Sequence, residues 1–402
     1  MNEDLHRSLS GARWRGRILG MIVLLVIALS LFRPLLWNDY QQIRSASVGV
    51  ERHQVLVNAA SDVLCLVMVV AALFGLVITR IGAIALNTFR EAVRNRILYF
   101  ILFFALILMG ASVAIRQLVN LEQERFITHI GLTSISFFGL MVAIFVGISL
   151  VYNELERKTI YTIVSKPIHR YQFLLGKYFG LLLTVYVIVG VMTFFFFTLV
   201  NYQQIASDDA IASVIYKMDQ NGEEVLVENA AWLKTGFLIK AAGVALLRGT
   251  ANLFGFPSGT VTENIMIVIA MFCLELMIVT AFAILYSSFS TPTLSAVFTV
   301  LTFLAGRLNE DIMRLAERIV GKAMHAQNVS VVGDLAWATQ AKAYIAEIAA
   351  LLVPNLDSLN VMSKALYQET MEVWRYPVLY ALCYTGCVLL LSVVIFRKRN
   401  FK

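Results

Sequence analysis

Eight apolar stretches set the pattern of this chain. They cover about residues 18–37, 63–79, 97–115, 130–152, 174–200, 265–289, 293–306 and 376–396. A helix of about 20 apolar residues crosses the hydrocarbon core of a bilayer, so these stretches predict membrane-spanning helices. The stretch 293–306 is short, and it spans only if it borrows flanking residues; the alternative is that it stops part-way.

The composition supports this interpretation. Apolar residues make up 59% of the 402 residues and charged residues only 15%, and the mean hydropathy is +0.75. Such a chain does not fit a soluble surface. We therefore expect an all-α integral membrane protein, a polytopic helical bundle with small extracytoplasmic α/β loop regions.

Basic residues gather at four places next to the apolar stretches: the N-terminal tail, the segment after 63–79, the segment after 130–152, and the C-terminal "FRKRNFK". With eight spans, all four places lie on one side of the membrane, which the positive-inside rule makes cytoplasmic. Both termini are then cytoplasmic, and the long loops 201–264 and 307–375 are external. The net charge of +7 follows from this topology and does not indicate nucleic-acid binding.

Several other classes lack support. The first apolar stretch is too long for a signal peptide and no small-residue cleavage site follows it promptly. The four cysteines all fall in apolar stretches, so neither disulfides nor a metal site is indicated. No catalytic motif such as G-x-S-x-G or H-E-x-x-H occurs, and the inverted repeats of a secondary transporter are not evident. Without a G-x-x-x-x-G-K-[ST] phosphate loop, the chain is not expected to hydrolyse ATP by P-loop chemistry.

Two polar segments look amphipathic. Between 81 and 96, apolar residues recur at helical spacing and the polar residues fall largely elsewhere, which favours a helix in the membrane interface over a simple cytoplasmic connector. In the segment 153–173, Glu154 and Lys158 are four residues apart, and Ile160, Ile163 and Val164 form an apolar edge. Pro167 ends this short helix or begins the next. A solvated loop needs no apolar edge, so a docking surface is the other interpretation.

Two stretches of the external loop 201–264 and one acidic residue in a predicted span also carry structural signals. The stretch 214–227, "VIYKMDQNGEEVLV", predicts a β-hairpin around Asn221-Gly222. The stretch 230–249 is apolar enough to lie on a membrane or pack on an external domain, but Lys234 and Lys240 argue against spanning. Glu275 is the ionisable residue deepest in a predicted span. It is either a functional intramembrane acid or one with a structural role, such as pairing with a hydroxyl or backbone group on a neighbouring helix.

Three pieces together resemble the type-2 class of ABC transporter permeases, in particular stand-alone bacterial membrane subunits: "LNTFREAVRNRILYFILFFALIL", "NELERKTIYTIVSKPIHRYQFLLGKYFG" and "PNLDSLNV…VVIFRKRNF". The resemblance covers about 81–401. It implies an interfacial connecting helix at 81–96, with Phe89, Arg90, Glu91 and Arg94, and a six-span core at 97–402. It also implies a coupling segment at 153–173 that binds a separate ATPase. The residues that match the coupling motif are Glu154, Glu156, Arg157, Lys158, Thr159, Tyr161, Ser165, Lys166 and Pro167.

The function that the resemblance implies is that of a permease subunit, an exporter by family expectation, in a bacterial inner membrane. Its partners would be an ABC ATPase, which holds the ATP and Mg²⁺, and a second permease copy, identical or related. The sequence also leaves open a complex that transmits ATPase work to an extracytoplasmic partner without transporting a solute. Residues 1–80 depart from the family pattern, since they add an N-terminal extension with two spans of unassigned role.

Overall fold

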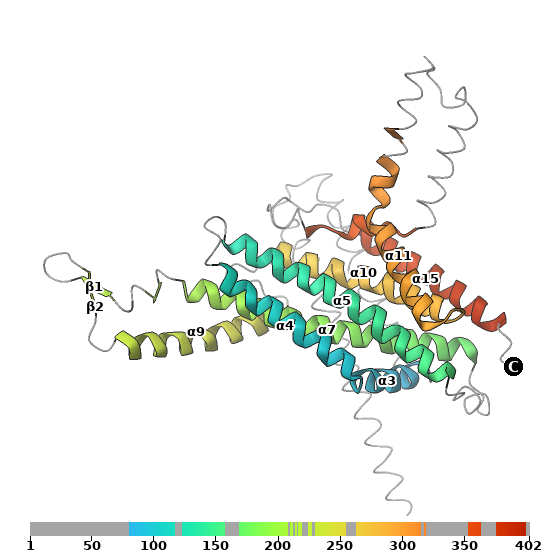
Figure 1. The fold of residues 1–402 in the computed structure, drawn as a ribbon, viewed down its shortest axis with the longest axis horizontal. Coiled ribbons are helices and arrows are strands. Elements are labelled where there is room, and N and C mark those ends of the chain that lie inside the picture. Colours follow the sequence, from blue (N-terminus) through green and yellow to red (C-terminus); the bar gives the residue numbers. More distant parts are fainter. Residues whose placement is uncertain are drawn as a thin grey trace, which may run out of the picture. The chain divides into compact units, whose positions relative to one another are not determined.

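The computed structural model describes residues 80–116, 123–156, 169–207, 210–211, 214, 216–218, 224–226, 230–254, 263–314, 317–318, 353–362 and 375–398. The predicted spans 18–37 and 63–79 lie outside these residues. Figure 1 shows the helices α3 (Arg80–Val93), α4 (Arg96–Arg116), α5 (Gln123–Glu156), α7 (Arg170–Ile205), α9 (Ala230–Leu253), α10 (Glu263–Ser287), α11 (Pro292–Arg307) and α15 (Arg375–Lys398). A 3-10 turn covers Asp357–Leu359, and the strands are β1 (Tyr216–Met218) and β2 (Glu224–Leu226).

Five helices in the described part of the chain are long and apolar enough to cross a membrane. Their apolar segments are Arg96–Val113, Arg125–Ile148, Tyr171–Ile205, Asn264–Ser287 and Pro377–Arg397. They confirm five of the predicted spans. The sixth, α11, is an apolar helix of only 16 residues; Pro292 occupies its first turn, where a missing N–H costs nothing.

Apart from Glu275, the middle of α10 is apolar on all sides, and 94% of its most apolar stretch of 18 residues is buried. The apolar segments of α4 and α15 are only 22% and 28% buried. A helix that is apolar all round needs neighbours or lipid on every side. α10 is therefore an interior helix, whereas α4 and α15 present much of their surface to the surroundings.

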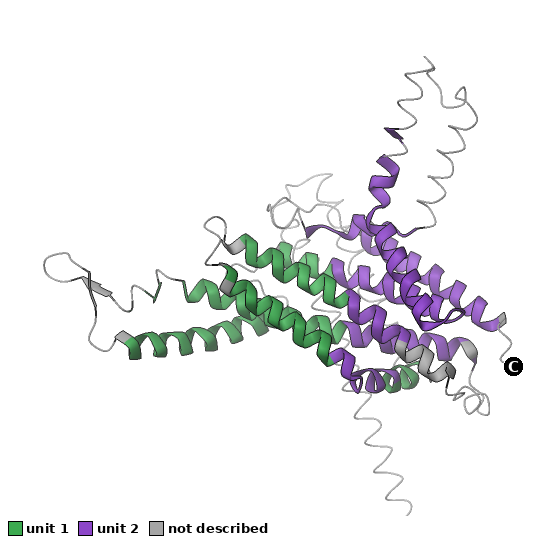
Figure 2. Cartoon of the chain, in the orientation of Figure 1, with its two compact units in different colours: residues 1–87, 99–139, 186–270 green, residues 88–98, 140–185, 271–402 purple. Residues whose placement is uncertain are grey.

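The chain divides into two compact units (Figure 2). Unit 1 takes in residues 1–87, 99–139 and 186–270, and unit 2 takes in residues 88–98, 140–185 and 271–402. Among the described candidate residues, unit 2 contains Phe89, Arg90, Glu91, Arg94, Glu154, Glu156 and Glu275. The helix ends that border the coupling segment thus share one compact unit with the buried acid.

A helix, α3, is present where the sequence predicts the connecting helix. Gly82, Ala85, Thr88 and Ala92 are buried at spacings of three and four residues, whereas Asn87, Arg90 and Arg94 are exposed, so α3 has one covered face and one polar face. The chain then turns at Arg94–Asn95. The Asn95 side-chain oxygen accepts a hydrogen bond from the Ile97 N–H at 3.1 Å, which caps the start of α4. The helix therefore ends at Val93, three residues before the predicted limit.

Unit 1 contains the predicted hairpin. β1 and β2 pair antiparallel, with Tyr216 opposite Leu226 and Met218 opposite Glu224, and Asn221-Gly222 falls in the connection between them. α9 follows the hairpin and covers the predicted stretch 230–249. It is not among the helices that meet the criteria of a span, as the lysine residues led us to expect.

Candidate functional site

The predicted coupling segment connects two long helices. α5 continues past its apolar segment to end at Glu156, so Glu154 and Glu156 belong to its last turn. α7 begins at Arg170, three residues after Pro167. Arg157, Lys158, Thr159, Tyr161, Ser165, Lys166 and Pro167 lie outside the described residues. A displacement of this segment would act directly on the ends of α5 and α7, because both helices enter it.

The first turns of α7 are held by three neighbouring helices. The Phe173 ring stacks on Phe396 of α15, with 6.3 Å between the ring centroids. The Tyr178 hydroxyl donates a hydrogen bond to the Met277 carbonyl of α10 at 3.2 Å. On α5, a Cβ at Gly147 would lie 2.8 Å from Leu181 Cδ2, so the missing side chain allows α5 and α7 to pack closely.

Lys177 lies on the same part of α7 and is buried to 2% exposure. Its Nζ lies 5.5 Å from the centroid of the Phe173 ring, within reach of a cation–π interaction. The start of α7 is therefore packed through aromatic, polar and close-packed contacts rather than through lipid-facing surface.

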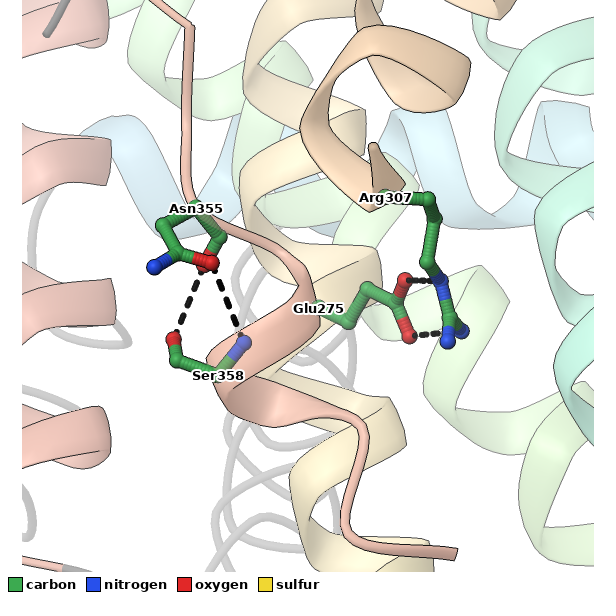
Figure 3. A network of polar contacts seen from close by, with 4 residues as sticks. All are labelled: Glu275, Arg307, Asn355 and Ser358. Carbon is green, nitrogen blue, oxygen red and sulfur yellow. Dashed lines mark hydrogen bonds and ion pairs between the residues drawn. The ribbon is translucent and has the colours of Figure 1, made fainter. Parts of the chain in front are cut away.

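Glu275 forms an ion pair with Arg307 (Figure 3). The Arg307 Nη2 donates to Glu275 Oε2 at 2.9 Å, and Arg307 Nε lies 2.8 Å from Oε1. The second contact is an ion-pair contact without the alignment of a hydrogen bond, since Oε1 has no well-aligned donor among the described residues. The side chains are 2% and 22% exposed. Arg307 also lies over the Phe303 ring, 5.6 Å from its centroid.

The pair places the end of α11 beside the middle of α10. Glu275 is the central residue of the 25-residue α10, about 18 Å from either end at 1.5 Å per residue. Arg307 is the last residue of α11. Along α10, α11 therefore ends part-way, as in the second alternative for this short stretch, and after a turn at Leu308 the chain is helical again from Asn309 to Arg314.

A segment from Val353 to Met362 returns to the end of α11. The Leu356 N–H donates to the Gly306 carbonyl at 3.1 Å, and Asn309 Nδ2 donates to the Val353 carbonyl at 3.1 Å. Leu356 and Leu359 are fully covered. We call these residues, 353–362, the return segment; it packs where α11 ends and satisfies backbone groups that a helix end leaves open.

The return segment is itself stabilised by local hydrogen bonds. The Asn355 side-chain oxygen accepts from the Ser358 N–H at 3.1 Å, and the Ser358 hydroxyl donates to the Asn355 carbonyl at 2.9 Å; both are drawn in Figure 3. The Asn355 N–H donates to the Tyr380 hydroxyl of α15 at 2.8 Å. The segment thus connects α11 to α15.

These contacts form one physical network within unit 2. It leads from α7 at Tyr178 to α10 at Met277, and within α10 to Glu275, two residues away. From there it passes to α11 through Arg307, and to α15 through the return segment. Spatial continuity alone does not establish energetic coupling. The network identifies the helices that contact the start of α7 directly and those that are one contact further away.

Sequence analysis missed Arg307, which it assigned to the start of an external loop. Among the described residues, the partner of Glu275 is this arginine, and not a hydroxyl or backbone group, which the sequence analysis gave as examples of a structural role. A usable signal was present: a 16-residue helix is about 24 Å long, so a charge at its end falls short of the far interface. A charge at that depth requires an opposite charge, and Glu275 was the deepest acid.

The comparisons with known proteins agree with this architecture. Residues 82–218 match the family model described as ABC-2 family transporter protein. This range holds α3, α4, α5, the predicted coupling segment, α7 and β1. No curated protein matches the chain. Residues 82–218 are therefore similar to the ABC-2 family transporter proteins, and the five long apolar helices of the described residues make the chain a multi-pass membrane protein.

Proposed function

We propose that the chain is the membrane subunit of an ATP-driven exporter in a bacterial inner membrane, and that a separate ABC ATPase energises it by docking on residues 153–173. One observation carries the proposal most. The two helices that enter this segment belong, at that end, to the same compact unit as α10, α11 and α15, and the start of α7 is fixed to α10 and α15 by named contacts.

In the proposed mechanism, two permease copies and two ATPases form the working unit. The ATPases hold ATP and Mg²⁺, and their closure displaces residues 153–173 of each permease on the cytoplasmic side, where both termini also lie. The acidic end of α5 at Glu154 and Glu156, followed by Arg157 and Lys158, offers both signs of charge for a specific contact. The charged contact specifies the partner, and the packed start of α7 carries the displacement into unit 2.

The contact must be rigid to be useful. Inverting a two-state population from 1:99 to 99:1 requires about 5.5 kcal/mol of differential binding. If the contact were a mobile loop, much of this binding free energy would be consumed in ordering the loop and would not displace the helices. An α7 whose first three turns are clamped by Phe396, Met277 and the close approach at Gly147 can transmit it.

The proposal predicts that an ABC ATPase copurifies with the tagged full-length chain in mild detergent. Mass spectrometry identifies the subunit, and an ATPase assay follows its activity. The variant Glu154→Ala with Arg157→Ala should lose the ATPase, because it removes one charge of each sign from the docking segment.

The matched control is Glu310→Ala with Arg314→Ala, which removes an exposed acid–base pair at 3.1 Å outside the coupling segment. It should retain the ATPase. Absence of an ATPase from the unmodified chain under several extraction conditions, or equal loss in both double variants, would contradict docking on residues 153–173.

A further inference from the structure

One face of α9 packs on the end of α7 in unit 1. The residues buried on this face are small or polar and recur every three to four positions: Ala241, Ala245, Gly249 and Asn252. A Cβ at Gly249 would lie 2.5 Å from Thr198 Oγ1 and 3.3 Å from Thr198 N. Small residues therefore allow the two helix backbones to approach closely.

The first ten residues of α9 project beyond that contact. The chain runs along α7 to its end, passes through the hairpin and comes back along α9 (Figure 1). From Thr198, α7 continues for about 10 Å to Ile205, whereas α9 extends about 28 Å from Gly249 to Ala230, at 1.5 Å per residue. Burial agrees with this difference, because no side chain from 231 to 240 is buried.

The projecting surface is apolar. Trp232 is 81% exposed and Ile239 73%, and nearer the contact with α7 Leu247 is 71% exposed. Large apolar side chains that stay exposed together mark an interaction site. α7 ends in the polar run "NYQQ" from Asn201, which we take as the level of the membrane interface. On this assignment, the part of α9 that extends beyond the end of α7 lies outside the hydrocarbon core.

The exposed face has a seven-residue repeat. Trp232, Ile239 and Leu246 are seven residues apart, and Gly236 and Gly243 lie between them on the same side of the helix. We call these five residues the seam. Both glycines have no atom within 4 Å of the Cβ position. A solvent-facing glycine in a helix costs roughly 1 kcal/mol relative to alanine. Two of them on the apolar face, spaced by one heptad, are suited to the close approach of a second helix.

Charge narrows the choice of that second helix. α9 carries Lys234, Lys240 and Arg248 and no acidic residue. On a helical projection all three lie outside the seam formed by Trp232, Gly236, Ile239, Gly243 and Leu246. In a parallel pair of identical helices, Lys240 faces Thr235 of the other copy. A second α9 therefore matches the uncharged seam and brings no like charges into contact.

We propose that the occupant of this face is the α9 helix of a second copy of the chain, so that two copies form a parallel helix pair outside the membrane. The inference rests on the proposed function, in which two permeases share one membrane orientation; a two-fold axis along the membrane normal then makes their α9 helices parallel. Each residue of the seam meets its own counterpart across the axis.

Disulfide cross-linking in native membranes tests the pairing. The chain carries Ile239→Cys or, as a matched control, Lys234→Cys, with Cys65, Cys383 and Cys387 replaced by alanine; both test positions are exposed. Seam residues of a parallel pair bring Cα atoms within the 4.4–6.8 Å that a disulfide needs, whereas position 234 points away. We expect an oxidised dimer with Ile239→Cys at a yield at least about tenfold that of Lys234→Cys.

Equal yields at both positions, or no dimer at position 239 in protein that still copurifies with the ATPase, would overturn the α9 pair and leave the permease proposal intact. A cross-link from position 239 to another protein or to lipid would also overturn it. A dimer at position 239 without any copurifying ATPase would instead support the pair and contradict the proposed function. Trp232→Cys, one heptad earlier, repeats the test where Ile239→Cys lowers the amount of protein.

Discussion

Replacing Arg307 with leucine is expected to lower the free energy of unfolding by about 3 kcal/mol, because it leaves the Glu275 carboxylate buried without its ion-pair partner. Glu275→Leu should cost a comparable amount for the same reason. The expected loss lies at the lower end of the range for buried pairs, since Arg307 keeps 22% of its side-chain surface exposed. Unfolding of the purified variants, followed by thermal melts in detergent, measures the effect.

The double variant Glu275→Leu with Arg307→Leu tests whether the two side chains interact directly. It removes both charges, so it should be clearly more stable than the sum of the single losses predicts. The exposed pair Arg314–Glu310 serves as control, and breaking it should change stability by less than about 1 kcal/mol. Strict additivity of the two leucine substitutions would contradict a direct interaction between Glu275 and Arg307.

Gly306→Ala is expected to destabilise the protein by about 1–3 kcal/mol, the usual cost of forcing a methyl group into a packed site. A Cβ at Gly306 would lie 2.7 Å from the Pro354 carbonyl oxygen and 2.8 Å from Leu356 Cδ1. The carbonyl belongs to the backbone of the return segment, so it can move only if that segment leaves the end of α11. The same melts measure the loss.

Gly386→Ala provides the comparison, because nothing lies within 4 Å of its Cβ position and the residue is inside α15. Alanine is the better helix former, so this variant should melt at the same temperature as the unmodified protein or slightly higher. If Gly306→Ala and Gly386→Ala behave alike, the return segment does not pack on α11 as described.

The spanning helices were predictable because apolar stretches of 20 residues have few alternatives in a chain of this composition. The amphipathic α3 and the hairpin were predictable for a similar reason, since local spacing determines both. Neither prediction required knowledge of which helices are neighbours.

The Glu275–Arg307 pair and the packing of the return segment were not predictable in this way. Gly306 and Leu356, which the return segment brings into contact, are 50 positions apart in sequence, and no periodic signal connects them. Only the short length of α11 indicated that Arg307, at its end, would lie near the middle of the membrane. The exposed apolar face of α9 was not predictable either. The sequence shows that the helix carries Lys234 and Lys240, but only the structure shows that Trp232 and Ile239 are exposed.

The central claim is that residues 153–173 contact a separate ABC ATPase, and site-specific photo-cross-linking tests it most directly. A photoreactive amino acid replaces Tyr161 in the full chain, and a second variant carries it at Trp232 on α9, which is 81% exposed. The account predicts an adduct between position 161 and a protein with a P-loop, and none from position 232. An adduct with the ATPase from position 232 alone, or no adduct from position 161 in a chain that still copurifies with the ATPase, would contradict it.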